Sequence, residues 1–144
     1  MAEYSVAIAN KMGMSKEKIN KLNIAATLHD IGKIIIDEQV LNKTDRLTVN
    51  EWKLMREHPI KGANILKDIE EYKEIAHVVE AHHERYDGLG YPYGLKEDDI
   101  PLAARIIAVA DAYDAMTQFR TYRNARSPLE AIEELLKGKS TQFD

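Results

Sequence analysis

The chain has 144 residues, a size typical of one domain, and 44% of them are hydrophobic, which is enough for a single core. Its formal net charge of −4 argues against a general nucleic-acid or DNA binder, which usually carries a basic excess. The absence of cysteine excludes disulfides and thiolate metal sites, so any metal would bind imidazole and carboxylate. No apolar run approaches the roughly 20 residues of a membrane span and no signal peptide is visible, so a cytoplasmic domain without membrane insertion is expected.

Apolar residues recur at helical spacing along almost the whole chain, which predicts a compact all-α fold. The first predicted helix covers residues 2–12. A second begins after Ser15, whose hydroxyl can cap it, and ends near residues 30–32. Isoleucines 34–36 are β-branched but have no second strand with which to pair, so they are predicted to form a buried connector.

The middle of the chain carries a helix start signal. Thr48 and Glu51 have the spacing of a capping box and predict a helix that ends at His58. Pro59 suits the first turn of the short helix that follows. A further helix is predicted over residues 71–84.

The last third begins with a loop, because residues 87–94 include three glycines and a proline. A long apolar helix follows over residues 101–117, and Ser127 and Glu130 form a second capping box around Pro128. Since no repeat or linker interrupts the pattern, we expect one domain of about six or seven helices.

His29 and Asp30 stand together where the second helix ends. Adjacent helical side chains point about 100° apart, so both can reach one pair of metal ions. A carboxylate has two oxygens with which to bridge them. The alternative is an ordinary surface pair at a helix end.

His82 and His83 lie on the predicted helix 71–84. His82 falls in line with apolar residues such as Ile75 and is expected to face the core, with His83 one step round beside the same face. His77 lies more than a third of a turn from both, so we interpret it as a solvent or core-edge histidine. A lone histidine on an apolar face is usually a satisfied core residue, but two adjacent ones favour ligands.

Asp111 interrupts an apolar helical run over residues 104–112. A carboxylate buried there is costly unless it is paired or bound to metal, so Asp111 is a candidate ligand. Asp114 lies near the same face, and a salt bridge to an arginine such as Arg105 is the alternative for it.

His58 stands at a helix junction and alone is weak evidence of function. Together these positions favour a polynuclear His/Asp site over scattered surface histidines.

The motifs and their order resemble the HD-GYP family, a branch of the HD-domain metal phosphohydrolases, over nearly the whole chain. The matching segments are His29-Asp30-Ile31-Gly32-Lys33, Leu41-Asn42-Lys43, His58-Pro59, His82-His83-Glu84-Arg85-Tyr86-Asp87-Gly88-Leu89-Gly90-Tyr91-Pro92, Arg105-Ile106-Ile107-Ala108-Val109-Ala110-Asp111, Arg120-Thr121-Tyr122-Arg123 and Thr141-Gln142-Phe143-Asp144. A lone His-Asp pair carries little weight, whereas this ordered set is specific. The resemblance implies an HD-domain helical bundle.

The resemblance also implies a site with two divalent metal ions, iron or manganese, or zinc or nickel as substitutes. The implied ligands are His29, Asp30 and Asp111 for one ion and His58, His82 and His83 for the other, with Asp30 bridging. Lys33 and Asp30 are the implied catalytic residues, with Lys33 beside the scissile phosphate. The implied substrate-binding residues are Lys33, Gly88, Gly90, Tyr91, Pro92, Arg120 and Arg123, although either arginine alone could be an ordinary solvated charge.

Family members hydrolyse cyclic di-GMP to linear pGpG, and some continue to GMP, with a water that bridges two metal ions. The resemblance further implies a sensor or receiver domain in a longer protein, a diguanylate cyclase domain as a partner, and a homodimer. The family pattern has a first-helix histidine upstream of this chain and usually continues beyond Asp144. Residues 1–144 are therefore expected to be a domain truncated at both ends, with one metal ligand missing. Gln118-Phe119 also replaces a Ser-Asp pair that many members have.

Three alternatives to an active phosphodiesterase remain open. The first is a non-enzymatic module that binds the dinucleotide or a partner domain and uses its metal structurally, as the missing histidine suggests. The second is another HD-domain hydrolase, such as a nucleotidase, against which the Gly90-Tyr91-Pro92 loop and the His82-His83 pair argue. The third is an all-α interaction domain with scattered histidines.

Overall fold

The computed structural model describes residues 1–119 and 125–144, which form eight α-helices, three 3-10 helices and no β-strand. The α-helices are α1 (Ala2–Lys11), α2 (Lys16–Leu28), α3 (Glu38–Leu41), α4 (Val49–Met55), α5 (His58–Lys67), α6 (Lys73–Glu80), α7 (Leu102–Thr117) and α8 (Pro128–Lys137). The 3-10 helices are η1 (Ile31–Ile35), η2 (Glu70–Tyr72) and η3 (Glu97–Asp99). The all-α prediction is confirmed. Within these residues no helix has the length and apolar character needed to cross a bilayer.

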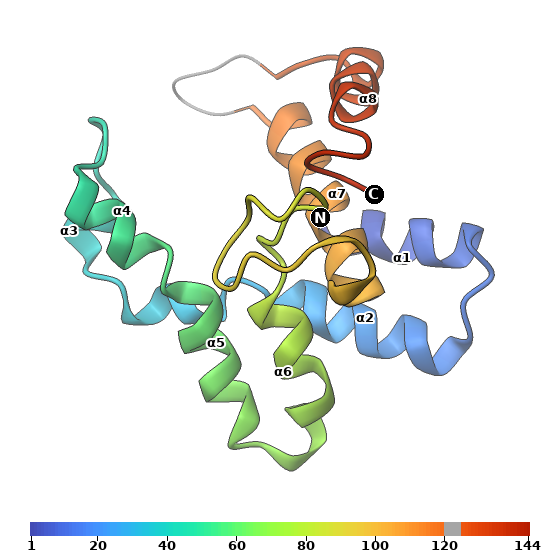
Figure 1. Ribbon diagram of the computed structural model, residues 1–144, viewed down its shortest axis with the longest axis horizontal. Coiled ribbons are helices and arrows are strands. Elements are labelled where there is room, and N and C mark those ends of the chain that lie inside the picture. Colours follow the sequence, from blue (N-terminus) through green and yellow to red (C-terminus); the bar gives the residue numbers. More distant parts are fainter. Residues whose placement is uncertain (120–124) are drawn as a thin grey trace.

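The body of the molecule is a bundle in which α1 packs against α2 and α7, α2 against α6, and α6 against α5. Helix α8 packs on α7, while α3 and α4 project from the body as an arm (Figure 1). Small side chains let the helices approach closely, since Ala9, Ala25, Ala63 and Ala76 are fully buried. Ile107 on α7 is also fully buried and belongs to the same core.

Local capping signals set the starts of three helices as predicted. The Ser15 hydroxyl accepts a hydrogen bond from the Lys18 amide at the start of α2. Thr48 and Ser127 each form a complete capping box, at the starts of α4 and α8. These interactions lie within four residues of chain, which is why the sequence alone predicts them.

The buried connector predicted at isoleucines 34–36 is wrong. Ile34 is 76% exposed and Ile35 is 52% exposed, at the end of η1 where the chain enters the arm. A 3-10 helix has about three residues per turn, so only one side of it can pack on α5. Ile31 and Gly32 occupy that side, where they lie against Gly62.

Two predicted helix ends are also wrong. Helix α4 ends at Met55 and α5 begins at His58, so His58 starts a helix and does not end one. The helix predicted over residues 71–84 is η2 followed by α6, which stops at Glu80 and leaves His82 and His83 in the turn that follows.

Candidate metal centre

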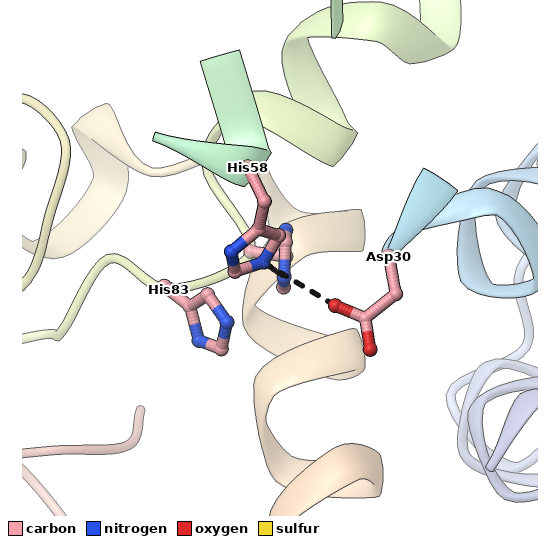
Figure 2. A group of neighbouring side chains, drawn as sticks. Asp30, His58 and His83 are labelled. Carbon is pink, nitrogen blue, oxygen red and sulfur yellow. Dashed lines mark hydrogen bonds and ion pairs between the residues drawn. The ribbon is translucent and has the colours of Figure 1, made fainter. Parts of the chain in front are cut away.

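Six side chains of the predicted site converge from four helices or their ends. His29 and Asp30 follow α2, His58 begins α5, His82 and His83 follow α6, and Asp111 lies on α7. Ligand atoms of Asp30, His58, His82 and His83 all lie within 4.8 Å of one another. His29 Nε2 lies 3.3 Å from Asp30 Oδ2 and 3.9 Å from Asp111 Oδ1. Figure 2 shows Asp30, His58 and His83 gathered at this centre.

A close approach of two backbones brings Asp30 to His58. A Cβ atom added to Gly32 would lie 2.0 Å from the His58 carbonyl oxygen and 2.5 Å from the Gly62 nitrogen. Only a residue without a side chain therefore lets η1 lie this near the first turn of α5. The result is a distance of 3.3 Å between His58 Nε2 and Asp30 Oδ1 (Figure 2).

Three of the histidines are oriented by their own backbone. The Nδ1 atom of His29 lies 2.8 Å from the Ala26 carbonyl oxygen, and that of His58 lies 2.7 Å from the Met55 carbonyl oxygen. His82 makes the same contact with Val79 at 2.5 Å. A carbonyl oxygen only accepts hydrogen bonds, so each Nδ1 is the donor, and each neutral ring presents an unprotonated Nε2 to the centre. Metal-binding histidines are held in this way.

The centre is electron-rich and fits a cation. His58 Nε2 and His82 Nε2 are 3.4 Å apart, and both lack a proton in the tautomer that their carbonyl contacts select. Asp30 Oδ1 is buried beside them without a hydrogen-bond donor in the described part of the chain. Buried lone pairs that face one another without a proton between them are costly, and a metal ion removes that cost. Imidazole with carboxylate suits iron, manganese or zinc.

Asp30 stays ionised in this setting. Burial alone would raise its pKa, but the contacts of its other oxygen with His29 and Lys33 outweigh burial and hold the pKa well below its usual range. Lys33 Nζ lies 2.6 Å from Asp30 Oδ2. Burial alone would lower the pKa of His29, but the Asp30 carboxylate raises it above its usual value. The carboxylate is therefore available as an anionic ligand at neutral pH.

His82 and His83 stay neutral. Burial, with the neighbouring His83 ring as the next cause, lowers the pKa of His82 well below its usual value. Burial also lowers the pKa of His83 to about 3, and His58 adds to the effect. Neutral imidazole is the form that binds a metal, so these two side chains need no proton loss at neutral pH.

Asp111 is less buried than the sequence indicated, because 39% of its side chain is exposed. The burial that remains still raises its pKa, and the nearby Asp30 charge acts in the same direction against the opposing effect of His29. The alternative pairing of Asp114 with Arg105 does not form, since Arg105 pairs with Asp98 and with the C-terminal Asp144.

The loop after the histidine pair is held by Glu84, which sequence reasoning did not single out. Glu84 is buried, and its two carboxylate oxygens accept hydrogen bonds from the amides of Tyr93, Gly94 and Leu95. A Cβ on Gly90 would lie 2.3 Å from the Arg85 nitrogen, so the loop folds back tightly on its own start. The signal available in the sequence was a glutamate just before a glycine-rich loop, whose amides need acceptors.

This loop places Tyr91 directly on the centre. The Tyr91 amide donates a hydrogen bond to the His83 carbonyl oxygen at 3.2 Å, and the Tyr91 and His83 rings stack with centroids 4.9 Å apart. Burial raises the pKa of Tyr91 to about 12, so its hydroxyl keeps its proton. A pocket of about 230 Å³ opens beside the same histidines and is also lined by Asp111 and Phe143.

The remaining predicted residues divide into three groups. Gly88 turns the loop with a φ of +78°, and Pro92 follows Tyr91 through a cis peptide bond. His77 is exposed and lines a separate groove between α2 and α6, so it lies away from the centre as expected. Arg120 and Arg123 lie outside the described residues.

Comparison with known sequences gives the family. The HD domain family matches residues 1–144, so the chain belongs to it. The chain is 43% identical over 136 residues to a cyclic di-GMP phosphodiesterase of Thermotoga maritima, covering 92% of this chain and 37% of that protein. It is 38% identical over 146 residues to the cyclic di-GMP phosphodiesterase response regulator RpfG of Xanthomonas campestris, covering 100% of this chain and 39% of that protein. It thus spans well under half of each of these relatives.

A third relative and two solved structures agree with this result. The chain is 34% identical over 146 residues to 3'3'-cGAMP-specific phosphodiesterase 2 of Vibrio cholerae, covering 100% of this chain and 28% of that protein. An HD-GYP protein of Bdellovibrio bacteriovorus superposes with a TM-score of 0.78 at 26% identity, covering 99% of this chain and 46% of the other. The cyclic GMP-AMP phosphodiesterase V-cGAP3 of Vibrio cholerae superposes with a TM-score of 0.75 at 20% identity, covering 99% and 39%, and shows the fold alone. The HD-GYP resemblance is confirmed.

Proposed function

We propose that the chain is a metal-dependent phosphodiesterase that hydrolyses cyclic di-GMP to linear pGpG, with GMP as a further product. The observation that carries this proposal is the convergence of two carboxylates and four histidines on one partly buried centre. Its relatives in Thermotoga maritima and Xanthomonas campestris are named cyclic di-GMP phosphodiesterases, which supports the choice of substrate.

The six converging residues divide into two ligand sets in this proposal. His29, Asp30 and Asp111 would hold the first ion and His58, His82 and His83 the second, and Asp30 has a second carboxylate oxygen with which it could serve both. Two divalent ions would supply a water of lowered pKa and a positive charge against which the phosphodiester is held. The native ions are proposed to be iron or manganese, as the family resemblance implies, and the nitrogen and oxygen ligands of the centre also suit zinc or nickel as substitutes.

The side chains around the centre orient the substrate. Asp30 remains an anion at working pH, and Lys33, 2.6 Å from it, is positioned to donate a proton or a hydrogen bond to the departing oxygen. Tyr91 stacks on His83, and the loop that holds it, with Gly88, Gly90 and Pro92, is proposed to contact the dinucleotide. Arg120 and Arg123 are proposed to hold phosphate oxygens, for which the guanidinium group has matching geometry.

The wider setting is proposed from the relatives. RpfG is named a response regulator, which supports a receiver or other sensor domain in the whole protein. A diguanylate cyclase domain as partner, a homodimer and a cytoplasmic location are further proposals.

The test is hydrolysis of cyclic di-GMP by the chain loaded with Mn²⁺, with products separated by chromatography. Asp30→Ala is expected to lose both metal and turnover, whereas His77→Ala, which removes a histidine from the separate groove, is expected to keep both. Equal turnover in the parent and in Asp30→Ala would contradict the proposal. Binding of cyclic di-GMP without turnover by the parent would favour the non-enzymatic binding module.

A further inference from the structure

Arg56 extends the line of side chains that leads outward from the metal centre. It caps the C-terminus of α4, two residues before His58. Its Cζ atom lies 5.1 Å from the centroid of the Tyr91 ring, and that ring stacks on His83 at 4.9 Å with an interplanar angle of 28°. The guanidinium is thus two contacts away from a proposed metal ligand, at the exposed border of the site.

Arg56 has no carboxylate partner in the part of the chain that the structure describes. The carboxylates nearest to it in sequence have other partners, since Glu57 pairs with Lys61 at 3.0 Å and Glu51 with Lys43 at 2.7 Å. Over residues 1–119 and 125–144 Arg56 makes no ion pair, and its guanidinium lies over the face of the Tyr91 ring. An arginine held by an aromatic ring keeps its N–H groups, which lie in the guanidinium plane, available for a ligand.

The chemistry of the site indicates which part of a cyclic dinucleotide the Arg56 guanidinium would contact. The scissile phosphate already has a proposed pair of metal ions and the Lys33 ammonium. A planar donor fork beyond Tyr91 matches the O6 and N7 acceptors on one edge of guanine, which adenine does not offer as a pair. The relatives named above act on cyclic di-GMP or on 3'3'-cGAMP, and each of these compounds contains guanine.

We propose that Arg56 is a specificity-determining residue that binds the O6/N7 edge of a guanine base in the cyclic dinucleotide. This inference rests on the proposed function, because it needs a cyclic dinucleotide at the metal centre. It assigns base selection to α4, whereas the six side chains of the centre act on the phosphate.

The test compares three ligands in the Mn²⁺-loaded chain by calorimetric titration. Cyclic di-GMP and cyclic di-IMP share the O6/N7 edge, and cyclic di-AMP lacks it. Arg56→Ala is expected to weaken the binding of cyclic di-GMP and cyclic di-IMP by about tenfold, which is in the range of one bidentate contact. The preference for these two ligands over cyclic di-AMP should fall by the same factor. Arg56→Lys keeps the charge and can still donate to O6 or N7 but lacks the planar fork, so it is expected to keep only part of the preference. Arg46→Ala, an exposed arginine earlier in the same arm, is the matched control and should bind like the parent.

The outcomes separate this inference from the function on which it rests. If the parent binds cyclic di-GMP and Arg56→Ala binds all three ligands like the parent, the inference about Arg56 is wrong and the function stands. An equal loss of affinity for all three ligands would mean that Arg56 contacts phosphate, and it would also overturn the inference that Arg56 binds guanine. If the parent binds none of the three, the proposed function fails and the inference fails with it. Metal content measured in each variant shows that the centre is intact.

Discussion

Gly32→Ala is expected to separate η1 from α5. The new Cβ would lie 2.0 Å from the His58 carbonyl oxygen and 2.5 Å from the Gly62 nitrogen, and both are backbone atoms that no side-chain rotation can move. Heavy atoms in such contacts need at least about 3 Å, so the two segments must part by about 1 Å. Overpacking of this kind costs about 1–3 kcal/mol of stability, and the backbone contact favours the upper end.

The same displacement acts on the proposed metal centre. Asp30 precedes η1 and His58 begins α5, so parting these segments lengthens the 3.3 Å distance between His58 Nε2 and Asp30 Oδ1. Changes that disturb the orientation of ligands typically weaken metal affinity about 10- to 100-fold. Gly32→Ala is therefore expected to bind Mn²⁺ more weakly by a factor in that range.

Urea denaturation and Mn²⁺ titration measure the two effects in parallel. Gly13→Ala is the control, because a Cβ there meets nothing within 4 Å but the backbone has a φ of +71°. It should cost about 1–2 kcal/mol of stability through backbone strain and leave Mn²⁺ affinity unchanged. If Gly32→Ala were as stable as the parent and bound Mn²⁺ equally well, the reasoning from the close contact would be refuted.

Three further predictions concern the loop, the arm and the substrate. Glu84→Gln leaves one loop amide without an acceptor, so it should cost about 1–3 kcal/mol and speed hydrogen exchange at the amides of residues 93–95; unchanged exchange would contradict this. Hydrogen bonds from Lys43 and Thr48 lower the Glu51 pKa from 4.5 to about 2. The stability that ionised Glu51 adds to α4 is therefore fully present above pH 4.5 and is lost as the pH falls toward 2. The single tryptophan, Trp52 on α4, should report that change by fluorescence in the parent and not in Glu51→Gln. Arg120→Ala and Arg123→Ala should each weaken cyclic di-GMP binding with metal content intact, and parent-like calorimetric affinities would place the phosphate contacts elsewhere.

The helices that could be predicted from sequence are those with local signals. Ser15, Thr48 and Ser127 bond to amides a few residues away, so the starts of α2, α4 and α8 follow from short stretches of chain. The ends of elements near the centre depend on distant residues. Glu84 is buried because the amides of residues 93–95 need an acceptor, and this bonding across the loop accompanies the end of α6 at Glu80.

The candidate site was predicted as a set of residues, and its geometry was predicted less well. His82 and His83 were expected on a helix at fixed angles, yet they reach the centre from a turn. Sequence reasoning missed Glu84, which holds the loop that carries Tyr91, and Arg56, which lies over the Tyr91 ring. The close contact of Gly32 with α5 likewise depends on tertiary packing, which the spacing of residues in the sequence does not encode.

The most direct test of the central claim is anomalous X-ray scattering from crystals of the chain grown with Mn²⁺. We predict a peak bounded by Asp30, His58, His82 and His83, with a second near His29 and Asp111, and none in the groove beside His77. A map without a peak at this centre, from crystals in which the six side chains are ordered, would contradict the claim that these residues form a metal site.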